Sequence, residues 1–488
     1  MDWYFDGVWL VRLFFQRGLA AIYLVAFVSA LNQFRPLLGE RGLLPVPVFV
    51  SRVPFKESPS LFHYRYSDRL FGVVAWTGIV LSSAALLGLP EMGPVWLSFA
   101  VWLGLWALYL SIVNVGQTFY AFGWESMLLE AGFFACFLGP AHVEPSLVPI
   151  LALRWMLFRT EVGAGLIKLR GDPCWRDRTC LYYHHETQPL PNPLSWHFHH
   201  LPKRAHRAGV VFSHFVQIVA PFGLFFPQPV ASIAGAFIIL HQLMLIVSGN
   251  YAWLNWLTVV LGLTAFGDGV LGAVSPIDVP ATEPRSLAYQ IVLYALAAAT
   301  VLLSIKPAKN LWSKDQLMNF SYNPIHLVNA YGAFGSVTRE RLEVVLEGSA
   351  DAEGREWKEY GFRGKPGDPR RRPPQVAPYH LRLDWLMWFL PLSGILRPKL
   401  WFVRMVEKLL EGDRSMRTLL KVDPFPDLPP RWIRARLFLY EFTDKEERAA
   451  TGQWWKREPV GEYLPPVSIT PTPERRTVRQ HERARVTH

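Results

Sequence analysis

The sequence predicts a membrane α-helical bundle of about eight to nine transmembrane helices, followed by a C-terminal α+β extramembrane domain with an antiparallel sheet. The 488 residues are 51% apolar and only 18% charged, which is more apolar than an ordinary soluble enzyme. Long apolar runs recur up to Ile305 and then give way to shorter segments in which apolar and polar residues alternate. The 20 Trp and 32 Phe residues fit a chain that meets a lipid interface.

Each membrane helix is predicted from an apolar run of about 20 residues, the length that spans a bilayer. The fourth run is weak because Glu125 and Glu130 interrupt it, and the seventh and eighth runs could instead form a broken or partly re-entrant pair. The count is therefore open by about two helices. The predicted segments are 12–34, 70–90, 95–115, 122–139, 146–169, 209–226, 229–248, 250–267 and 286–305.

The net charge and the cysteine count limit which partners the chain could bind and how many disulfides it could form. The formal net charge of +11 fits anionic lipid better than nucleic acid, because the basic residues lie in loops, in the C-terminal third and in the tail, and no nucleic-acid motif accompanies them. Three Cys residues leave room for one local bridge only. No small-x-small site closes the first apolar run, Gly18–Leu31, so we expect a retained membrane helix there instead of a cleaved signal.

Two long basic connections, Arg35–Arg69 and Arg170–Ala208, lie on the same side of the predicted bundle, whereas the connections on the other side are short and acidic. The positive-inside rule would place the long connections and the C-terminal body in the cytoplasm. Long loops obey this rule weakly, and one missed helix would reverse half of the argument. The residues alone leave the sidedness open.

The sequence divides into residues 1–310 as the membrane domain, 311–465 as the extramembrane domain and 466–488 as a disordered basic tail with no apolar face to bury. Within the second part, Arg341–Leu346 and Arg355–Gly364 are predicted to form a β-hairpin across a turn-rich connection. Two further segments, Tyr379–Phe389 and Trp432–Phe442, are predicted as strands or amphipathic segments, and Leu400–Glu411 as an amphipathic helix.

Three charged residues in the fifth predicted helix, Arg154, Glu161 and Lys168, recur every seven positions and therefore share one helix face. An ionisable side chain at membrane depth costs at least about 2.5 kcal/mol, so these groups should face a cavity or one another. One interpretation is a structural ion pair with Glu125 or Glu130 of the neighbouring helix, and the other is a buried acid and base. In either case we expect an opposite charge within about 4 Å of Glu161 or Lys168.

The connection over residues 170–208 concentrates His, Trp, Cys and Pro. The run His184, His185 and Glu186, followed by further histidines, suggests a metal cluster, but neither HExxH nor a paired Cys motif is present, and we expect no metal site. In Gln188–Pro193 the residues before each proline favour extended geometry, which predicts a stiff, non-helical strap. No nucleophile elbow, Walker loop or dinucleotide fingerprint is found, so the sequence predicts no cofactor.

Two cysteines in this connection, Cys174 and Cys180, are separated by five residues. In an oxidising compartment this spacing can close a small loop, and on the cytoplasmic side the two would be free thiols. If they pair, their Cα atoms should lie within about 7 Å.

The run CLYYHHETQPLPNPLSW, within residues 160–202, closely resembles the signature of the lipase maturation factor family, multi-pass membrane proteins that certain secreted lipases need in order to fold. The segments VNAYGAFGSVTRERLEVVLEGS and WWKREPVGEYLPP also resemble the family, so the similarity covers nearly the whole chain except the tail. The resemblance implies an endoplasmic reticulum membrane with the C-terminal body in the lumen, opposite to the charge rule, or a plasma membrane if the source is prokaryotic.

The resemblance also implies a non-enzymatic role in which the helices anchor the protein among membrane lipids while the loop and the extramembrane hairpin domain hold a lipase-like client. Because prolines restrict the loop, we expect it to present exposed aromatic rings in one arrangement. The residues expected to bind the client are Trp175, His184, His185, Glu186, Gln188, Asn192, Trp196 and His197.

A second resemblance is shorter. The run AGLIKLRGDPCW is distantly similar to vitamin K-dependent carboxylase-like membrane domains, in which a lysine near this position serves as a base. It implies a membrane-embedded enzyme acting on a lipid or quinone-like substrate with Glu161, Lys168 and the loop histidines. A lipid-accessible cavity shared by Lys168 with His184 or His185 would favour the enzyme, and a Lys168 sealed by a carboxylate would favour the maturation role.

Overall fold

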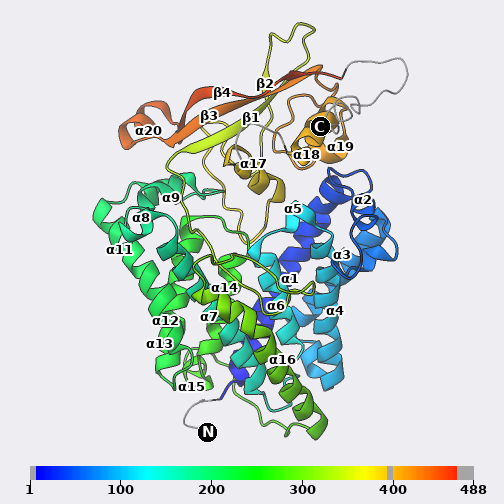
Figure 1. The fold of residues 1–488 in the computed structure, drawn as a ribbon, viewed down its shortest axis with the longest axis vertical. Helices are drawn as coiled ribbons and strands as arrows, with labels where there is room; N and C mark the ends of the chain where they lie inside the picture. Colours follow the sequence, from blue (N-terminus) through cyan, green and yellow to red (C-terminus); the bar gives the residue numbers. More distant parts are fainter. Residues whose placement is uncertain (1–6, 393–398, 470–488) are drawn as a thin grey trace.

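The computed structural model of the chain describes residues 7–392 and 399–469. Figure 1 shows the helices of the N-terminal part running side by side, with the strands gathered at one end of them. The first helices are α1 Trp9–Leu38, α2 Val46–Val50, η1 Leu61–His63, α3 Asp68–Leu87, η2 Pro90–Met92, α4 Val95–Asn114, α5 Gln117–Tyr120, α6 Gly123–Ala135 and α7 Leu147–Arg170.

The helices continue through the connection after α7 and end with the long helix α16. In order they are α8 Pro173–Arg176, α9 Leu181–Thr187, α10 Ser195–His199, α11 Lys203–His214, η3 Phe215–Val219, α12 Ala220–Gly223, α13 Val230–Ser248, α14 Leu254–Gly262, η4 Leu263–Ala265, α15 Asp268–Gly272 and α16 Leu287–Trp312.

Five of the described helices are long and apolar enough to cross a membrane: α1, α3, α4, α13 and α16. The expected count of eight or nine spans is not confirmed. The segment at 122–139 is helical only over Gly123–Ala135, the segment at 250–267 only over Leu254–Ala265, and the segment at 209–226 changes to a π-helix at Phe215. Gly123–Ala135 and Leu254–Ala265 are each shorter than the roughly 20 residues that a helix needs to span a bilayer.

The C-terminal part contains a four-stranded antiparallel sheet in the order β2-β1-β3-β4. Its elements are β1 Arg341–Ser349, β2 Lys358–Glu359, α17 Arg382–Leu392, α18 Leu400–Leu410, α19 Arg414–Arg417, β3 Trp432–Phe442, α20 Lys445–Thr451 and β4 Trp455–Val467. The strand predicted at Arg341–Leu346 and the helix predicted at Leu400–Glu411 are confirmed. The predicted basic tail lies almost wholly outside the described residues.

Two details of the predicted sheet differ. The strand expected over Arg355–Gly364 is paired only at Lys358–Glu359, because the chain then leaves β1 and Gly361 bonds to Val422 instead. The segment Tyr379–Phe389 forms the helix α17, and Trp432–Phe442 forms the strand β3, which pairs with β1 along its length.

Two buried carboxylates on α6 fix the helices to later parts of the chain. Glu125 accepts a hydrogen bond from Arg382 at the start of α17, at 2.7 Å between Nη1 and Oε1. Glu130 pairs with Arg159 of α7 and also accepts hydrogen bonds from the Asn329 backbone and side chain. The expectation of an ion pair between α7 and α6 is therefore correct, but Arg159 forms it instead of the Arg154, Glu161 and Lys168 face.

Candidate functional site

The connection after α7 folds into the short helices α8, α9 and α10, and Figure 1 shows α8 and α9 on the side of the bundle that faces the sheet. Asp172 starts α8 by accepting a hydrogen bond from the Cys174 amide, and Pro173 follows at the first helical position. Cys174 and Cys180 are joined, with Cα atoms 4.8 Å apart. Asp172 also pairs with Arg339 just before β1, so this end of the connection is tied to the sheet domain.

The strap predicted at Gln188–Pro193 is confirmed as non-helical. Its first side chain is buried, and Gln188 Nε2 donates hydrogen bonds to the carbonyl oxygens of His185 and Ser248 and to Ser195 Oγ. Gly249 makes room for this amide, because a Cβ at that position would lie 2.0 Å from Gln188 Oε1. Asn192 is buried as well and bonds to the Ile246 carbonyl. These polar residues hold the strap against the end of α13.

The aromatic rings of the connection are buried, so the expectation that they stand exposed is wrong. Trp196 is 5% exposed; its Nε1 donates to the Thr443 carbonyl at 2.7 Å, and the Arg448 guanidinium lies 4.5 Å from its ring centroid. Trp175 is 3% exposed and donates to the Phe334 carbonyl. A buried Trp has a large apolar ring and one N–H group that needs a hydrogen-bond acceptor. Here the C-terminal part covers the rings and provides the two acceptor carbonyls.

The same correction applies to most of the residues expected to bind a client. Trp175, His184, His185, Gln188, Asn192 and Trp196 are buried, Glu186 is partly buried and accepts a hydrogen bond from the Phe442 amide, and His197 is exposed. The connection is therefore bonded to the sheet, at Arg341 where β1 begins and at Phe442 and Thr443 where β3 ends.

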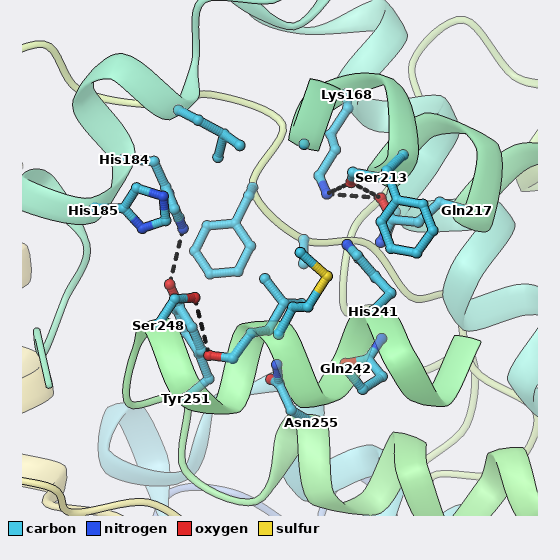
Figure 2. Close-up of a pocket in the computed structure, with 18 of the residues that line it drawn as sticks. Lys168, His184, His185, Ser213, Gln217, His241, Gln242, Ser248, Tyr251 and Asn255 are labelled. Carbon is cyan, nitrogen blue, oxygen red and sulfur yellow. Dashed lines mark hydrogen bonds between the residues drawn. The ribbon is translucent and has the colours of Figure 1, made fainter. Parts of the chain in front are cut away.

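One cavity lies between α7, α9, α11, α13 and α14 and encloses about 150 Å³. Figure 2 shows Lys168, Ser213, Gln217 and His241 on one side of it, and His184, His185 and Tyr251 on the other. Most of the wall is apolar. The polar residues that line it are Thr160, Glu161, Lys168, His184, His185, His206, Ser213, Gln217, His241, Gln242, Ser248, Tyr251, Asn255 and Thr258.

Glu161 and Lys168 both line this cavity, as predicted for charges turned into the bundle, but the expected opposite charge within about 4 Å is wrong. In the part of the chain that the structure describes, neither side chain forms an ion pair. Neutral groups satisfy them instead: Gln242 Nε2 donates to Glu161 Oε1 at 2.8 Å, and Lys168 Nζ donates to Gln217 Oε1 at 2.7 Å. The Lys168 ammonium also lies 4.7 Å from the centroid of the Trp175 ring.

The π-helix at Phe215–Val219 places Gln217 in the cavity wall. It can approach α7 closely only because residue 165 is a glycine: a Cβ there would lie 2.7 Å from Ile218 Cγ1 and 3.1 Å from the Gln217 carbonyl oxygen. A π-turn inside a helix is frequent at functional sites. The turn therefore carries a side chain that an uninterrupted α-helix would direct elsewhere.

The histidines of α9 are neutral at pH 7. Burial lowers the pKa of His184 to about 4, with a further contribution from the Lys168 charge, and burial lowers the pKa of His185 well below its ordinary value. His184 Nε2 and the Tyr251 hydroxyl lie 2.9 Å apart, and that hydroxyl donates to Gln188 Oε1. Within residues 7–392 and 399–469, no three His, Cys, Asp or Glu side chains gather with metal-binding geometry.

Sequence reasoning missed the polar residues that α13, α14 and the π-helix bring to the cavity. His241, Gln242 and Asn255 lie in the two segments predicted as membrane helices or as a broken, partly re-entrant pair, and Gln217 lies in the segment predicted at 209–226. Their presence inside apolar runs was the available signal, because polar side chains in such segments usually face a partner or a cavity. Which elements they would meet depends on helix packing, which the sequence pattern does not contain.

Comparison with known proteins identifies relatives over almost the full length. Two family models match: the lipase maturation factor transmembrane domain over residues 10–273 and the lipase maturation factor C-terminal domain over residues 327–465. Lipase maturation factor 1 of Mus musculus and that of Homo sapiens are each 40% identical to the chain, covering 94% of it and 88% of the relative. Lipase maturation factor 2 of Xenopus tropicalis is 30% identical, covering 94% and 82%. No solved structure matches the chain.

Proposed function

The chain belongs to the lipase maturation factor family, and on this basis we propose that it is a multi-pass membrane protein that assists the folding or assembly of a secreted, lipase-type client without catalysing a reaction. The observation that carries the proposal is the match of both family models, one to the helical part and one to the sheet-containing part. The relatives share the sheet-containing part, and we assign it to the outside of the membrane, where a client could reach it.

The way the sheet is mounted supports this role. Trp196 and Glu186 of the connection bond to the end of β3, and Arg382 bonds to Glu125 in the bundle. A body held on both sides presents its outer surface in one orientation, and a pre-organised surface loses less conformational entropy when it binds a partner. The client would therefore meet a fixed platform above the helices.

We assign the sheet and the connection after α7 to the oxidising side of an endoplasmic reticulum membrane. The Cys174–Cys180 bridge supports this assignment, because disulfides persist in the lumen and are rare in the cytosol. The positive-inside rule favours the reverse orientation, but it constrains long connections weakly. The bridge is the stronger argument, since it is a chemical feature of the loop itself.

Client contact is assigned to exposed side chains of the C-terminal part and not to the buried rings of the connection. Leu428, in the loop before β3, is 77% exposed and Val460 of β4 is 56% exposed. Exposed apolar side chains on a rigid body are suited to an interface with a partly folded partner.

The test is co-expression with a secreted lipase in cells that lack their own lipase maturation factors. Leu428→Asp and Val460→Asp should each lower secreted lipase activity, together by about tenfold or more, and should reduce co-purification of the lipase. Val274→Asp is the matched control, because Val274 is 82% exposed and follows α15, at the end of the bundle away from the sheet (Figure 1). Unchanged lipase activity and co-purification with both body variants would refute the assignment.

A second candidate, a membrane-embedded enzyme, draws on the cavity that Lys168 shares with His184 and His185. A cavity shared by these residues is the feature that, in the sequence analysis, would favour the enzyme. The relatives carry maturation-factor names, so the enzyme takes second place. Lys168→Met separates the two functions: if the variant folds normally and loses all function while the body variants keep it, the enzyme replaces the maturation platform.

A further inference from the structure

The cavity beside α7 has buried polar groups that no described residue satisfies. Glu161 Oε2, His241 Nδ1 and Asn255 Nδ2 are buried without a hydrogen bond of normal geometry, and all three residues line the cavity. Each of these side chains is at least nine-tenths buried. Leaving a buried polar group without a hydrogen bond is unfavourable, so a molecule that bonds to several of these groups at once would be held firmly. Figure 2 shows His241, Gln242 and Asn255 along one wall of the space.

The charges of the wall limit the chemistry of that molecule. Glu161 and Lys168 both line the cavity, so their opposite charges offset each other and favour neither an anionic nor a cationic head. Lys168 already has Gln217 and Ser213 as hydrogen-bond partners. The remaining needs are a donor for the carboxylate oxygen and an acceptor for the Asn255 amide. A neutral group with adjacent hydroxyls supplies both, because each hydroxyl donates and accepts.

The volume of the cavity and the position of its entrance limit the size of the ligand's head and the direction of any chain attached to it. About 150 Å³ is the size at which an engineered protein cavity admits benzene, which has as many non-hydrogen atoms as glycerol. On one side the wall is formed by side chains that are also exposed on the outer surface of the bundle: Leu201 at 42%, Met244 at 41%, and Ala205. The way out is apolar, so a chain attached to the head would leave between α11 and α13.

The helix beside this entrance has the character of one that lies at a membrane surface. In α11 the exposed residues Lys203, Arg204 and Arg207 alternate with the buried His206 and Val210. Basic amphipathic helices lie at the level of lipid headgroups. A lipid head that enters the cavity from this level needs to move only a short distance from its place in the bilayer.

We propose that the cavity between α7, α9, α11, α13 and α14 binds the glycerol head of a neutral single-chain acylglycerol, with the free hydroxyls on Glu161 and Asn255 and the acyl chain directed between Leu201 and Met244 into the membrane. The proposal does not rest on the maturation role, because it uses only the cavity and its entrance.

The test uses the purified full-length protein in phosphatidylcholine nanodiscs and a monoacylglycerol that carries a photoreactive diazirine near its ester. Mass spectrometry of the crosslinked peptides should place the label on α11 and α13. Unlabelled monoacylglycerol should compete, whereas the analogue with methylated hydroxyls and the free fatty acid of the same chain should each compete at least about tenfold less well, which corresponds to about one lost hydrogen bond to a charged group.

Ala205→Trp should block the entrance and lower labelling about tenfold, whereas Ala208→Trp, on the same helix but outside the cavity wall, should leave it unchanged. Asn255→Leu removes the amide donor while keeping the number of side-chain non-hydrogen atoms, and it gives a second variant if Ala205→Trp does not fold. Equal competition by the fatty acid, labelling spread evenly over the lipid-facing helices α3 and α16, or unchanged labelling in folded Ala205→Trp and Asn255→Leu would each overturn the proposal.

Discussion

Replacing Arg382 by Met should destabilise the junction between the bundle and the sheet domain more than any surface substitution. The Arg382 side chain is fully buried, and its Nη1 donates to Glu125 Oε1 at 2.7 Å and to the Phe119 carbonyl at 2.9 Å. Its guanidinium lies 3.4 Å from the centroid of the Tyr120 ring. Removing it leaves the Glu125 carboxylate buried and uncompensated, with only the Tyr109 hydroxyl and the neighbouring His380 nearby. Breaking one partner of a buried ion pair costs about 3 to 5 kcal/mol.

The measurement is the free energy of unfolding in detergent micelles, followed by tryptophan fluorescence, for Arg382→Met, Glu125→Gln and the double variant. Because the double variant no longer buries a lone charge, it should recover to within about 2 kcal/mol of the wild type. Arg355→Met, which removes an exposed pair with Glu353, is the control and should change stability by no more than about 0.5 kcal/mol. A cost below about 1 kcal/mol for Arg382→Met, or a double variant as unstable as the single one, would refute the reasoning.

Three further outcomes follow from the connection after α7. Trp196→Ala should cost about 3 to 5 kcal/mol and speed protease cleavage between β3 and the bundle, since it empties a buried site under the sheet; cleavage at the wild-type rate would contradict this. Cys174→Ser should lower stability by about 2 kcal/mol, and Cys180 should become reactive to a thiol reagent in oxidised membranes only in that variant; reactivity in the wild type would show that no bridge forms. Because the pKa of His184 is lowered to about 4, the stability gained from its neutral form is complete above pH 6.5 and is lost as the pH falls towards 4. His184→Gln should make this acid slope shallower by up to about 1.4 kcal/mol per pH unit, and an unchanged slope would exclude His184 as a contributor.

The sequence predicted the elements whose cause is local. The strand at Arg341 and the helix at Leu400 were found because their apolar residues recur with the period of the element. The strap at Gln188–Pro193 was found because proline restricts the residue before it. In each of these cases the determining residues lie within one segment.

The sequence could not predict which distant residues would become hydrogen-bond or ion-pair partners after folding. Glu125 was noticed as a charge in an apolar run, but Arg382 is 257 positions away and belongs to a segment predicted as a strand or amphipathic segment. The exposure of Trp196 was predicted incorrectly for the same reason, because the Thr443 carbonyl that covers it comes from the end of β3. The membrane helices show the same limit: five described helices are long and apolar enough to cross a membrane, and how far the shorter apolar segments continue as helices depends on the residues that pack around them.

The connection after α7 links the cavity to the sheet, because its residues form hydrogen bonds to both. His184 bonds to Tyr251, Tyr251 bonds to Gln188, and the Gln188 carbonyl accepts a hydrogen bond from Arg341, the first residue of β1, which in turn pairs with Glu343. Every member is buried or nearly so, and breaking one link leaves a polar group unsatisfied at a cost of roughly 1 to 3 kcal/mol. A substitution anywhere along this path therefore weakens the cavity and the mounting of the sheet together. Loss of function in such a variant cannot distinguish a client contact from a ligand contact, because client binding by the sheet domain and ligand binding in the cavity would both be weakened. Only side chains outside the path separate them: Leu428 and Val460 for the client, and Ala205 for the entrance of the cavity.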